Sequence, residues 1–331
     1  MAIPHPHDRL FRAAASNPER ALHLLRLVLP ESAFRKLDAT SLRIESGTFI
    51  DEDLAEVRSD LLLSARYDGM PVLIYLLLEH KSEVDRMVPV QMLGYLVNVW
   101  NAQHSALPGA PLSPILPILI SHADGGWTGP VALGDLFGGV LAKHPELVPF
   151  VPDYRLVLED LQRRDDESLR QAALDPGVAL TLVALRDARR RDVLATLRRF
   201  MGELKAVAAR RDAKLLLEQI VAYLMQVPPD LSLSELRDIL VEAHADPEEI
   251  MATIAEQLRG EARAEGRAQG RVEGRVEGKR ETVLEQLKLK FGDLTVEQKT
   301  VIENATPAEL DHFARRVLSA DDLSAVFAPE A

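Results

Sequence analysis

An unbroken apolar run from Val72 to Leu78 ends in Glu79, His80 and Lys81, and this stretch constrains the fold more than any other. A run without polar alternation predicts a strand that is covered on both faces, inside a sheet. The stretch therefore predicts a buried strand that carries an acid and a base at its tip.

The residues before this run predict a hairpin. Leu61, Leu62 and Leu63 mark a buried strand, and the following segment DGMP, residues 68–71, carries turn signals. The chain then returns as VLIYLLLE. Asp60 precedes the first strand and Glu79 closes the second, so the hairpin sets the two carboxylates roughly opposite each other at one end of a sheet.

Two neighbouring carboxylates repel each other unless a cation lies between them. Mg²⁺ prefers a few carboxylates together with waters and substrate phosphates, which such a partly open edge provides. Lys81 lies two residues after Glu79 and shares its face by the period of a strand, whereas His80 faces the opposite way. An ammonium group there can orient or help to deprotonate a water and can balance phosphate charge.

Three kinds of residue pattern follow one another along the chain, and they predict its fold and domains. Short strand-like runs alternate with helical stretches over residues 1–154, and Pro and Gly mark the joins, which predicts an α/β domain with a mixed sheet flanked by helices. Residues 155–258 repeat Leu, Ala and Arg at helical spacing, so we expect a helical region essentially free of strands. A Gly/Arg/Glu-rich helical linker over 259–282 and a small helical domain over 283–331 complete an all-helical C-terminal region.

Composition narrows the function classes. The chain of 331 residues has no cysteine, which excludes disulfides and thiolate metal sites and fits a reducing compartment. No apolar run approaches the roughly 20 residues of a membrane span, and MAIPHPHDRLFR lacks the apolar stretch of a signal peptide. We therefore expect a cytoplasmic protein without a membrane partner. A net charge of -12 means that a nucleic-acid partner is held locally or through cations.

These residues carry a resemblance. Ser59-Asp60, the hairpin and Glu79-His80-Lys81 resemble the D…(D/E)xK signature of the PD-(D/E)XK nuclease superfamily, with Ser59 in place of its proline. The segments PHDRLFR, IESGTFIDEDLAEVRSDLLLSAR and YLLLEHKSEVDRMVPVQMLGYLVNVW together resemble the recombination-promoting nuclease (Rpn) or putative-transposase family. That resemblance covers roughly the first 150 residues and implies a restriction-endonuclease-like fold.

The resemblance also implies site roles. Asp60 and Glu79 would be ligands of Mg²⁺ or Mn²⁺, the carbonyl of His80 would add a ligand, and Lys81 would be the catalytic lysine. Many members of this branch carry Gln where this chain has Lys81, and the lysine favours an active site. Asp8 and Gln91 are accessory candidates. The segment after the linker resembles C-terminal segments of unknown function that follow such domains.

Each candidate has a structural alternative. Asp60, Glu79 and Lys81 can form an ion pair at a strand edge, with no catalytic role. Asp8 before RLFRAAA suits the N-cap of a helix. His5 and His7 have His-x-His spacing, but we interpret them as part of a flexible N-terminus.

The linker contains Gly266, Gly270, Gly274 and Gly278 at intervals of four residues. Arginines and glutamates follow the same spacing and can form i,i+4 pairs, so we interpret the segment as a solvated helical linker. Close packing of two copies through the glycine stripe, giving a homo-oligomer, is the alternative.

Two functions stay open at this point. The first is a metal-dependent DNA endonuclease that promotes recombination or is related to transposases. The second is a non-catalytic interaction protein with a degenerate nuclease fold. The intact set of two acids and a lysine favours the first.

Overall fold

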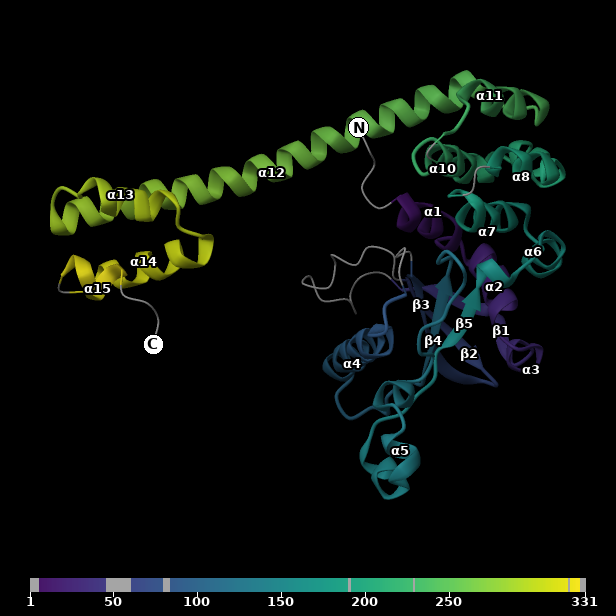
Figure 1. The fold of residues 1–331 in the computed structure, drawn as a ribbon, viewed down its shortest axis with the longest axis horizontal. Helices are drawn as coiled ribbons and strands as arrows, with labels where there is room; N and C mark the ends of the chain where they lie inside the picture. The colour runs from purple at the N-terminus through teal and green to yellow at the C-terminus, as the bar shows by residue number, and fades with distance from the viewer. Residues whose placement is uncertain are drawn as a thin grey trace. The chain divides into compact units, whose positions relative to one another are not determined.

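The computed structural model describes residues 6–45, 61–79, 84–189, 192–228, 230–320 and 322–327. Figure 1 draws the chain, which divides into two compact units, Met1–Ile254 and Ala255–Ala331. Within the described part of the chain, each helix is too short or too polar to cross a lipid bilayer.

The first unit contains all described strands and most of the helices. Its α-helices are α1 (Pro6–Ala15), α2 (Pro18–Val28), α3 (Glu31–Phe34), α4 (Val88–Ala106), α5 (Val140–Lys143), α6 (Asp166–Ala173), α7 (Pro176–Asp187), α8 (Val193–Arg199), α9 (Met201–Ala208), α10 (Lys214–Leu224) and α11 (Leu233–Glu242). Its strands are β1 (Leu37–Ile44), β2 (Leu61–Tyr67), β3 (Met70–Glu79), β4 (Ile115–Ser121) and β5 (Val157–Asp160). Short 3-10 turns are η2 (Leu133–Phe137), η3 (Pro145–Phe150), η4 (Leu161–Arg163) and η5 (Arg211–Ala213).

The long helix α12 (Pro247–Phe291) begins in the first unit and continues into the second. Three further helices follow it: α13 (Val296–Glu303), α14 (Pro307–Ser319) and α15 (Leu323–Phe327). The second unit has its own core, in which Leu287, Ile302 and Leu310 are fully buried.

The strands form one mixed sheet in the order β1-β2-β3-β4-β5. β1, β2 and β3 are antiparallel neighbours, whereas β3, β4 and β5 run parallel. This sheet confirms the predicted α/β domain with flanking helices. β3 is the middle strand, which explains why the sequence from Val72 to Leu78 is apolar without alternation.

The predicted hairpin is confirmed. β2 and β3 pair from Tyr67↔Met70 to Leu61↔Leu76. Asp68 and Gly69 make the turn with φ of 51° and 81°, the left-handed conformation that Asp and Gly tolerate best. β3 begins at Met70, two residues before the expected Val72.

Helices cover both faces of the sheet (Figure 1). On one face, Val88, Met92 and Leu96 of α4 pack against Leu62 of β2 and Leu119 of β4. On the other face, α2 contacts β1 and β5, and α1, α7 and α10 pack around α2 and one another. The first helices of the chain therefore share a core with helices that lie more than 150 residues later.

The expectation that residues 155–258 lack strands is wrong. Val157–Asp160 forms β5 and pairs in parallel with β4, from Ile118↔Val157 to Ser121↔Asp160. Four residues are too few to display a period, so the strand depends on hydrogen bonds from β4. The sequence predicted a boundary after residue 154, whereas the compact unit continues to Ile254 because α6, α7 and α10 pack on α1 and α2.

The glycine-rich segment lies inside α12, so its helical state agrees with the sequence interpretation. A Cβ atom added at Gly270, Gly274 or Gly278 would meet nothing within 4 Å. Packing against the described residues therefore does not require the small size of these three glycines.

Candidate functional site

The carboxyl edge of the parallel strands brings several polar residues into register. Glu79, the last residue of β3, pairs with Ser121, the last residue of β4. Ser121 pairs in turn with Asp160, the last residue of β5. Leu61 opens β2 and pairs with Leu76, so β2 begins at the edge where β3 ends. The last residues of β3, β4 and β5 are therefore polar and lie at the same end of the sheet.

Three predicted site residues, Asp60, His80 and Lys81, lie outside the described residues. The backbone of Glu79 is described as the end of β3, but its side chain is not. Among the described residues there is no group of three or more His, Cys, Asp or Glu that could hold a metal ion. The convergence of Asp60, Glu79 and Lys81 therefore stays a prediction.

Asp160 has a structural role at this edge. Its Oδ2 atom accepts a hydrogen bond of 2.8 Å from the backbone N of Trp127 and pairs with Arg163 Nε at 3.0 Å. Its Oδ1 atom accepts a hydrogen bond from the backbone N of Gln162 at 3.2 Å. Because both oxygens are engaged, Asp160 holds the loop after β4 against the end of β5.

A buried polar cluster lies next to the end of β4. The rings of His7, in α1, and His122, directly after β4, lie 4.8 Å apart between centroids. Tyr223, in α10, lies with its phenol oxygen 2.8 Å from Nδ1 of His7. All three residues are buried. Burial raises the pKa of the Tyr223 phenol, so this hydroxyl stays protonated. It can therefore donate a hydrogen bond to the imidazole of His7.

Asp8 lies in the first turn of α1, directly after His7, and only 3% of its surface is exposed. The N-cap alternative for Asp8 is wrong, because the helix already begins at Pro6. The interpretation of His7 as part of a flexible terminus is also wrong, since His7 is buried against Tyr223 and His122. His5 lies outside the described residues.

Gln91 lies in the first turn of α4 and is exposed. Its Nε2 atom donates a hydrogen bond of 3.0 Å to Oδ2 of Asp85, whose Oδ1 atom accepts from the backbone N of Met87. Gln91 therefore helps to fix the loop that leads into α4, and its role toward a substrate stays a prediction.

Sequence reasoning did not single out Ser121, His122 or Tyr223. The first two carry a visible signal, since ILPILISH repeats the pattern of VLIYLLLEH, an apolar run that ends in polar residues. Tyr223 sits inside the apolar helix KLLLEQIVAYL, where nothing local distinguishes it from a core residue.

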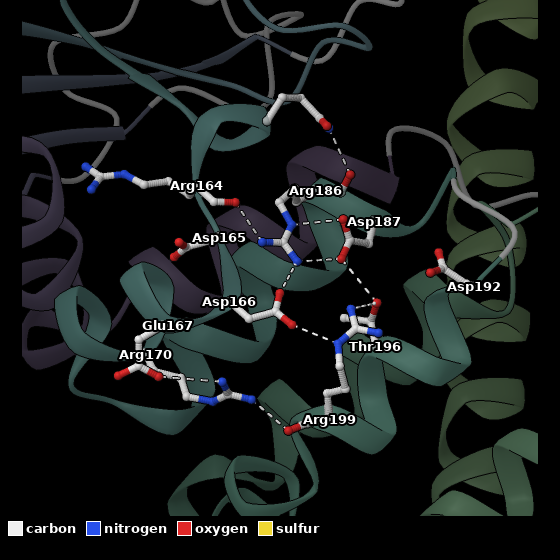
Figure 2. Close-up of a pocket in the computed structure, with 11 residues that line it drawn as sticks. Arg164, Asp165, Asp166, Glu167, Arg170, Arg186, Asp187, Asp192, Thr196 and Arg199 are labelled. Atoms are coloured by element: carbon white, nitrogen blue, oxygen red, sulfur yellow. Dashed lines mark hydrogen bonds and ion pairs between the residues drawn. The ribbon is translucent and has the colours of Figure 1, made fainter.

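A separate charged pocket of about 540 Å³ lies among α6, α7 and α8 (Figure 2). Its centre is Arg186, which donates to both carboxylate oxygens of Asp187 and, at 2.5 Å, to Oδ1 of Asp166. Arg199 donates to the other oxygen of Asp166 at 2.8 Å. The described residues of the lining include four arginines and five acids, and the ion pairs of Arg186 and Arg199 with Asp166 and Asp187 link α6, α7 and α8.

Comparisons with known proteins agree with the predicted family. Residues 5–214 match the model of the family described as "Putative transposase, YhgA-like". The chain is 26% identical over 260 residues to the recombination-promoting nuclease RpnA of Escherichia coli K12, which covers 77% of this chain and 84% of RpnA. No solved structure matches the chain.

Two further relatives differ in what their names say. The recombination-promoting nuclease RpnD of Escherichia coli O157:H7 is 30% identical over 117 residues, which are 35% of this chain and 45% of RpnD. The inactive recombination-promoting nuclease-like protein RpnE of Escherichia coli K12 is 24% identical over 261 residues, 77% of this chain and 82% of RpnE. The matches therefore include proteins named as nucleases and a protein named as inactive.

Proposed function

Because the chain belongs to the YhgA-like putative transposase family, we propose that it is a nuclease that cuts the phosphodiester backbone of DNA with the help of a divalent cation. The match to RpnA over most of both chains supports nuclease chemistry. DNA is the proposed partner. A cytoplasmic location and a homo-oligomer stay predictions from the sequence.

The register at the carboxyl edge of the sheet carries the proposal. Asp60 directly precedes Leu61, whose partner Leu76 lies three residues before Glu79. We therefore expect the two acids of the motif at neighbouring ends of β2 and β3. Buried Asp8 and His122 belong to elements that meet at the end of β4, the strand next to β3. A hydrolytic site needs several polar and titratable side chains close together, and one edge of the sheet is where we expect them.

The residue types fit a hard cation. Asp60 and Glu79 supply carboxylate oxygens, and the carbonyl of His80 is a third oxygen donor of the kind that Mg²⁺ and Mn²⁺ accept. Cysteine, which would favour softer metals, is absent from the chain. When bound, the cation would supply Lewis-acid stabilisation of the negative charge that develops on the phosphate.

Lys81 has a different task from the two acids. Its ammonium group donates up to three hydrogen bonds and accepts none, so it can hold a water molecule beside the phosphate and offset negative charge. The two carboxylates would bind the cation, whereas the lysine would orient the water molecule. Loss of either acid and loss of the lysine should therefore produce different defects.

The inactive relative RpnE matches nearly the same length of this chain as RpnA does. A non-catalytic protein with a nuclease-like fold is therefore the second candidate function. The two candidates differ in one measurable property, which is turnover of DNA at Asp60, Glu79 and Lys81.

A cleavage assay separates the candidates. Supercoiled plasmid is incubated with the purified chain and Mg²⁺ or Mn²⁺, and Asp60→Ala is compared with the wild type. Nicked or linear product from the wild type and none from Asp60→Ala is the expected result. Glu167→Ala, which removes an exposed carboxylate from α6, is the matched control and should cut like the wild type. Cleavage by Asp60→Ala at the wild-type rate would place the activity elsewhere or in a contaminant. No cleavage by the wild type with either metal would favour the non-catalytic candidate.

A further inference from the structure

A second pocket, of about 450 Å³, lies between α1 and the start of α10, beside the turn that joins α1 to α2. Among the described residues, its lining includes three arginines, Arg9, Arg12 and Arg20, and one acid, Asp212. The charged pocket around Arg186 differs, because acids outnumber arginines among the described residues of its lining. The pocket stands out further because the whole chain carries a net charge of -12.

Arg20 is the structural centre of this pocket. It occupies the first turn of α2, and only 7% of its surface is exposed. Its Nη2 atom donates a hydrogen bond of 3.1 Å to the backbone carbonyl of Asp212. Within the described part of the chain, no carboxylate pairs with this guanidinium, and four of its five N–H groups have no acceptor.

Burying a guanidinium group without a carboxylate partner costs free energy unless another group accepts its hydrogen bonds. Arg186, which is equally buried, satisfies this condition with two aspartates. Arg20 instead lines an open pocket, so an anion that enters the pocket can accept its remaining hydrogen bonds.

The carboxylate of Asp212 does not meet this need. Both of its oxygens accept hydrogen bonds from Arg210, at 3.3 Å and 2.7 Å. The hydrogen bond from Arg210 holds the pKa of Asp212 below its usual value, so the carboxylate stays ionised and committed to that partner. The Asp212 backbone carbonyl, not its carboxylate, faces Arg20.

The position of the pocket connects it to the proposed site. α1 carries Asp8 in its first turn and Arg9 and Arg12 within the next four residues, a distance of about 6 Å along the helix axis. Arg9 and Arg12 are three residues apart, so they lie on the same side of α1. A DNA strand that runs along α1 from its first turn would therefore meet both arginines.

We propose that Arg20, with Arg9 and Arg12, forms a binding groove for the phosphate backbone of the DNA strand that leaves the proposed cleavage site. The ligand is DNA because the inference rests on the proposed function. Guanidinium groups match phosphate oxygens in charge and geometry, and phosphate contacts position a nucleic acid without reading its sequence. The groove therefore supplies affinity, whereas Asp60, Glu79 and Lys81 supply the chemistry.

The test measures binding without cleavage. A fluorescein-labelled DNA duplex is titrated with the full chain in EDTA at several salt concentrations, and affinity is read from fluorescence anisotropy. The variants are Arg12→Ala, the double variant Arg9→Ala/Arg12→Ala, and Arg20→Lys, which keeps the buried charge but cannot reach the same acceptors. Arg35→Ala, which removes an exposed arginine that pairs with Glu31 in α3, is the control for the loss of one positive charge.

The slope of log K against log salt is negative, and each groove arginine replaced by alanine should reduce its magnitude by about 0.9, while affinity falls equally for unrelated DNA sequences. Arg20→Lys keeps its charge, so it should lower affinity with a smaller change of slope. Arg35→Ala should keep the wild-type slope. Wild-type affinity and slope in the Arg9, Arg12 and Arg20 variants would overturn the groove, and so would a wild-type chain that does not bind DNA. Circular dichroism of each variant checks that it is folded.

The outcome is separable from that of the nuclease proposal. If the groove variants bind DNA normally while Asp60→Ala abolishes cleavage, the groove is wrong and the nuclease stands. If the groove variants weaken binding while the wild type never cuts DNA, the groove stands and the catalytic proposal is wrong.

Discussion

The phenol oxygen of Tyr223 lies 2.8 Å from Nδ1 of His7, so a hydrogen bond joins residues that are 216 positions apart in the chain. His7 precedes Asp8 in α1, and its ring also lies against His122 at the end of β4. Tyr223 comes from residues 155–258, which the sequence predicts as a helical region that follows the α/β domain. Its contact with His7 shows that this helical region completes the environment of the sheet edge.

We predict that Tyr223→Phe weakens both stability and activity. Loss of the hydroxyl removes the hydrogen bond to His7 and should lower the free energy of unfolding by about 1 kcal/mol. Both tryptophans of the chain, Trp100 and Trp127, lie in the first unit, so urea unfolding followed by tryptophan fluorescence reports on that unit.

Tyr154→Phe is the matched control for this prediction. The Tyr154 hydroxyl donates to the backbone carbonyl of Pro89, away from His7, and burial raises its pKa to about 12. This variant should lose a similar amount of stability and keep more of the DNA cleavage rate. Equal cleavage rates in the two variants would show that the Tyr223 hydrogen bond serves stability alone.

The second prediction concerns the dependence of stability on pH. Burial by itself would raise the pKa of Asp166, but hydrogen bonds from Arg186 and Arg199 outweigh it and hold this pKa below its usual value. A lowered pKa in the folded state stabilises the protein above the unfolded value of about 3.9, and this stabilisation is lost as pH falls through the folded value.

Asp166→Asn should therefore be less stable than the wild type near pH 7, and the difference should shrink as the pH falls below about 4. Urea unfolding at a series of pH values measures the difference. Glu167→Gln, a change at an exposed residue of the same pocket, should follow the wild type throughout. A difference between Asp166→Asn and the wild type that stays constant with pH would contradict the role given to Arg186 and Arg199.

Gly126, in the loop after β4, combines a left-handed backbone conformation with a close approach to Asp160. Its φ is 86°, and a Cβ added there would lie 2.9 Å from Oδ2 of Asp160, the atom that accepts from the backbone N of Trp127. Gly109 has nearly the same φ, 84°, but a Cβ there would meet nothing within 4 Å.

Gly109→Ala should therefore cost about 1 to 2 kcal/mol from backbone strain alone. Gly126→Ala should cost about 1 to 3 kcal/mol more, because Asp160 must also move and leave buried groups unpaired. The two urea midpoints, measured by tryptophan fluorescence, give the comparison. Similar midpoints would mean that Asp160 can shift without losing its hydrogen bonds.

The hairpin and the central strand could be predicted because their signals are local. The turn at Asp68-Gly69 and the apolar run after it lie within about 20 residues of sequence. β5 could not, because a four-residue edge strand is specified by its neighbour β4 and not by its own pattern. The packing of α10 on α1 is a contact between distant segments, and helical periodicity shows which face of a helix is apolar but not what covers it.

The candidate site divides in the same way. The motif from Asp60 to Lys81 could be found in the sequence because its spacing repeats a known signature, and the position of Glu79 at the end of β3 agrees with that prediction. His122 and Tyr223 could not be assigned, since their nearness to His7 exists only after the sheet and the helical layer have packed. Arg20 looks like an ordinary charge in the first turn of α2 until its burial is known.

The last prediction separates metal binding from catalysis. Glu79→Ala should abolish cleavage and the stabilisation by Mg²⁺ together, since one remaining carboxylate holds Mg²⁺ poorly against water. Lys81→Ala should keep the stabilisation by Mg²⁺ but lower the cleavage rate, by about 10²- to 10⁴-fold, because only the group that orients water and balances charge is lost. Lys81→Gln should fall between Lys81→Ala and the wild type, because an amide still hydrogen bonds a water but carries no charge. Thermal melts with and without Mg²⁺, run beside the plasmid assay, measure both properties. If Mg²⁺ stabilises Glu79→Ala as much as the wild type, the cation binds elsewhere in the chain and the assignment of Glu79 as its ligand is wrong.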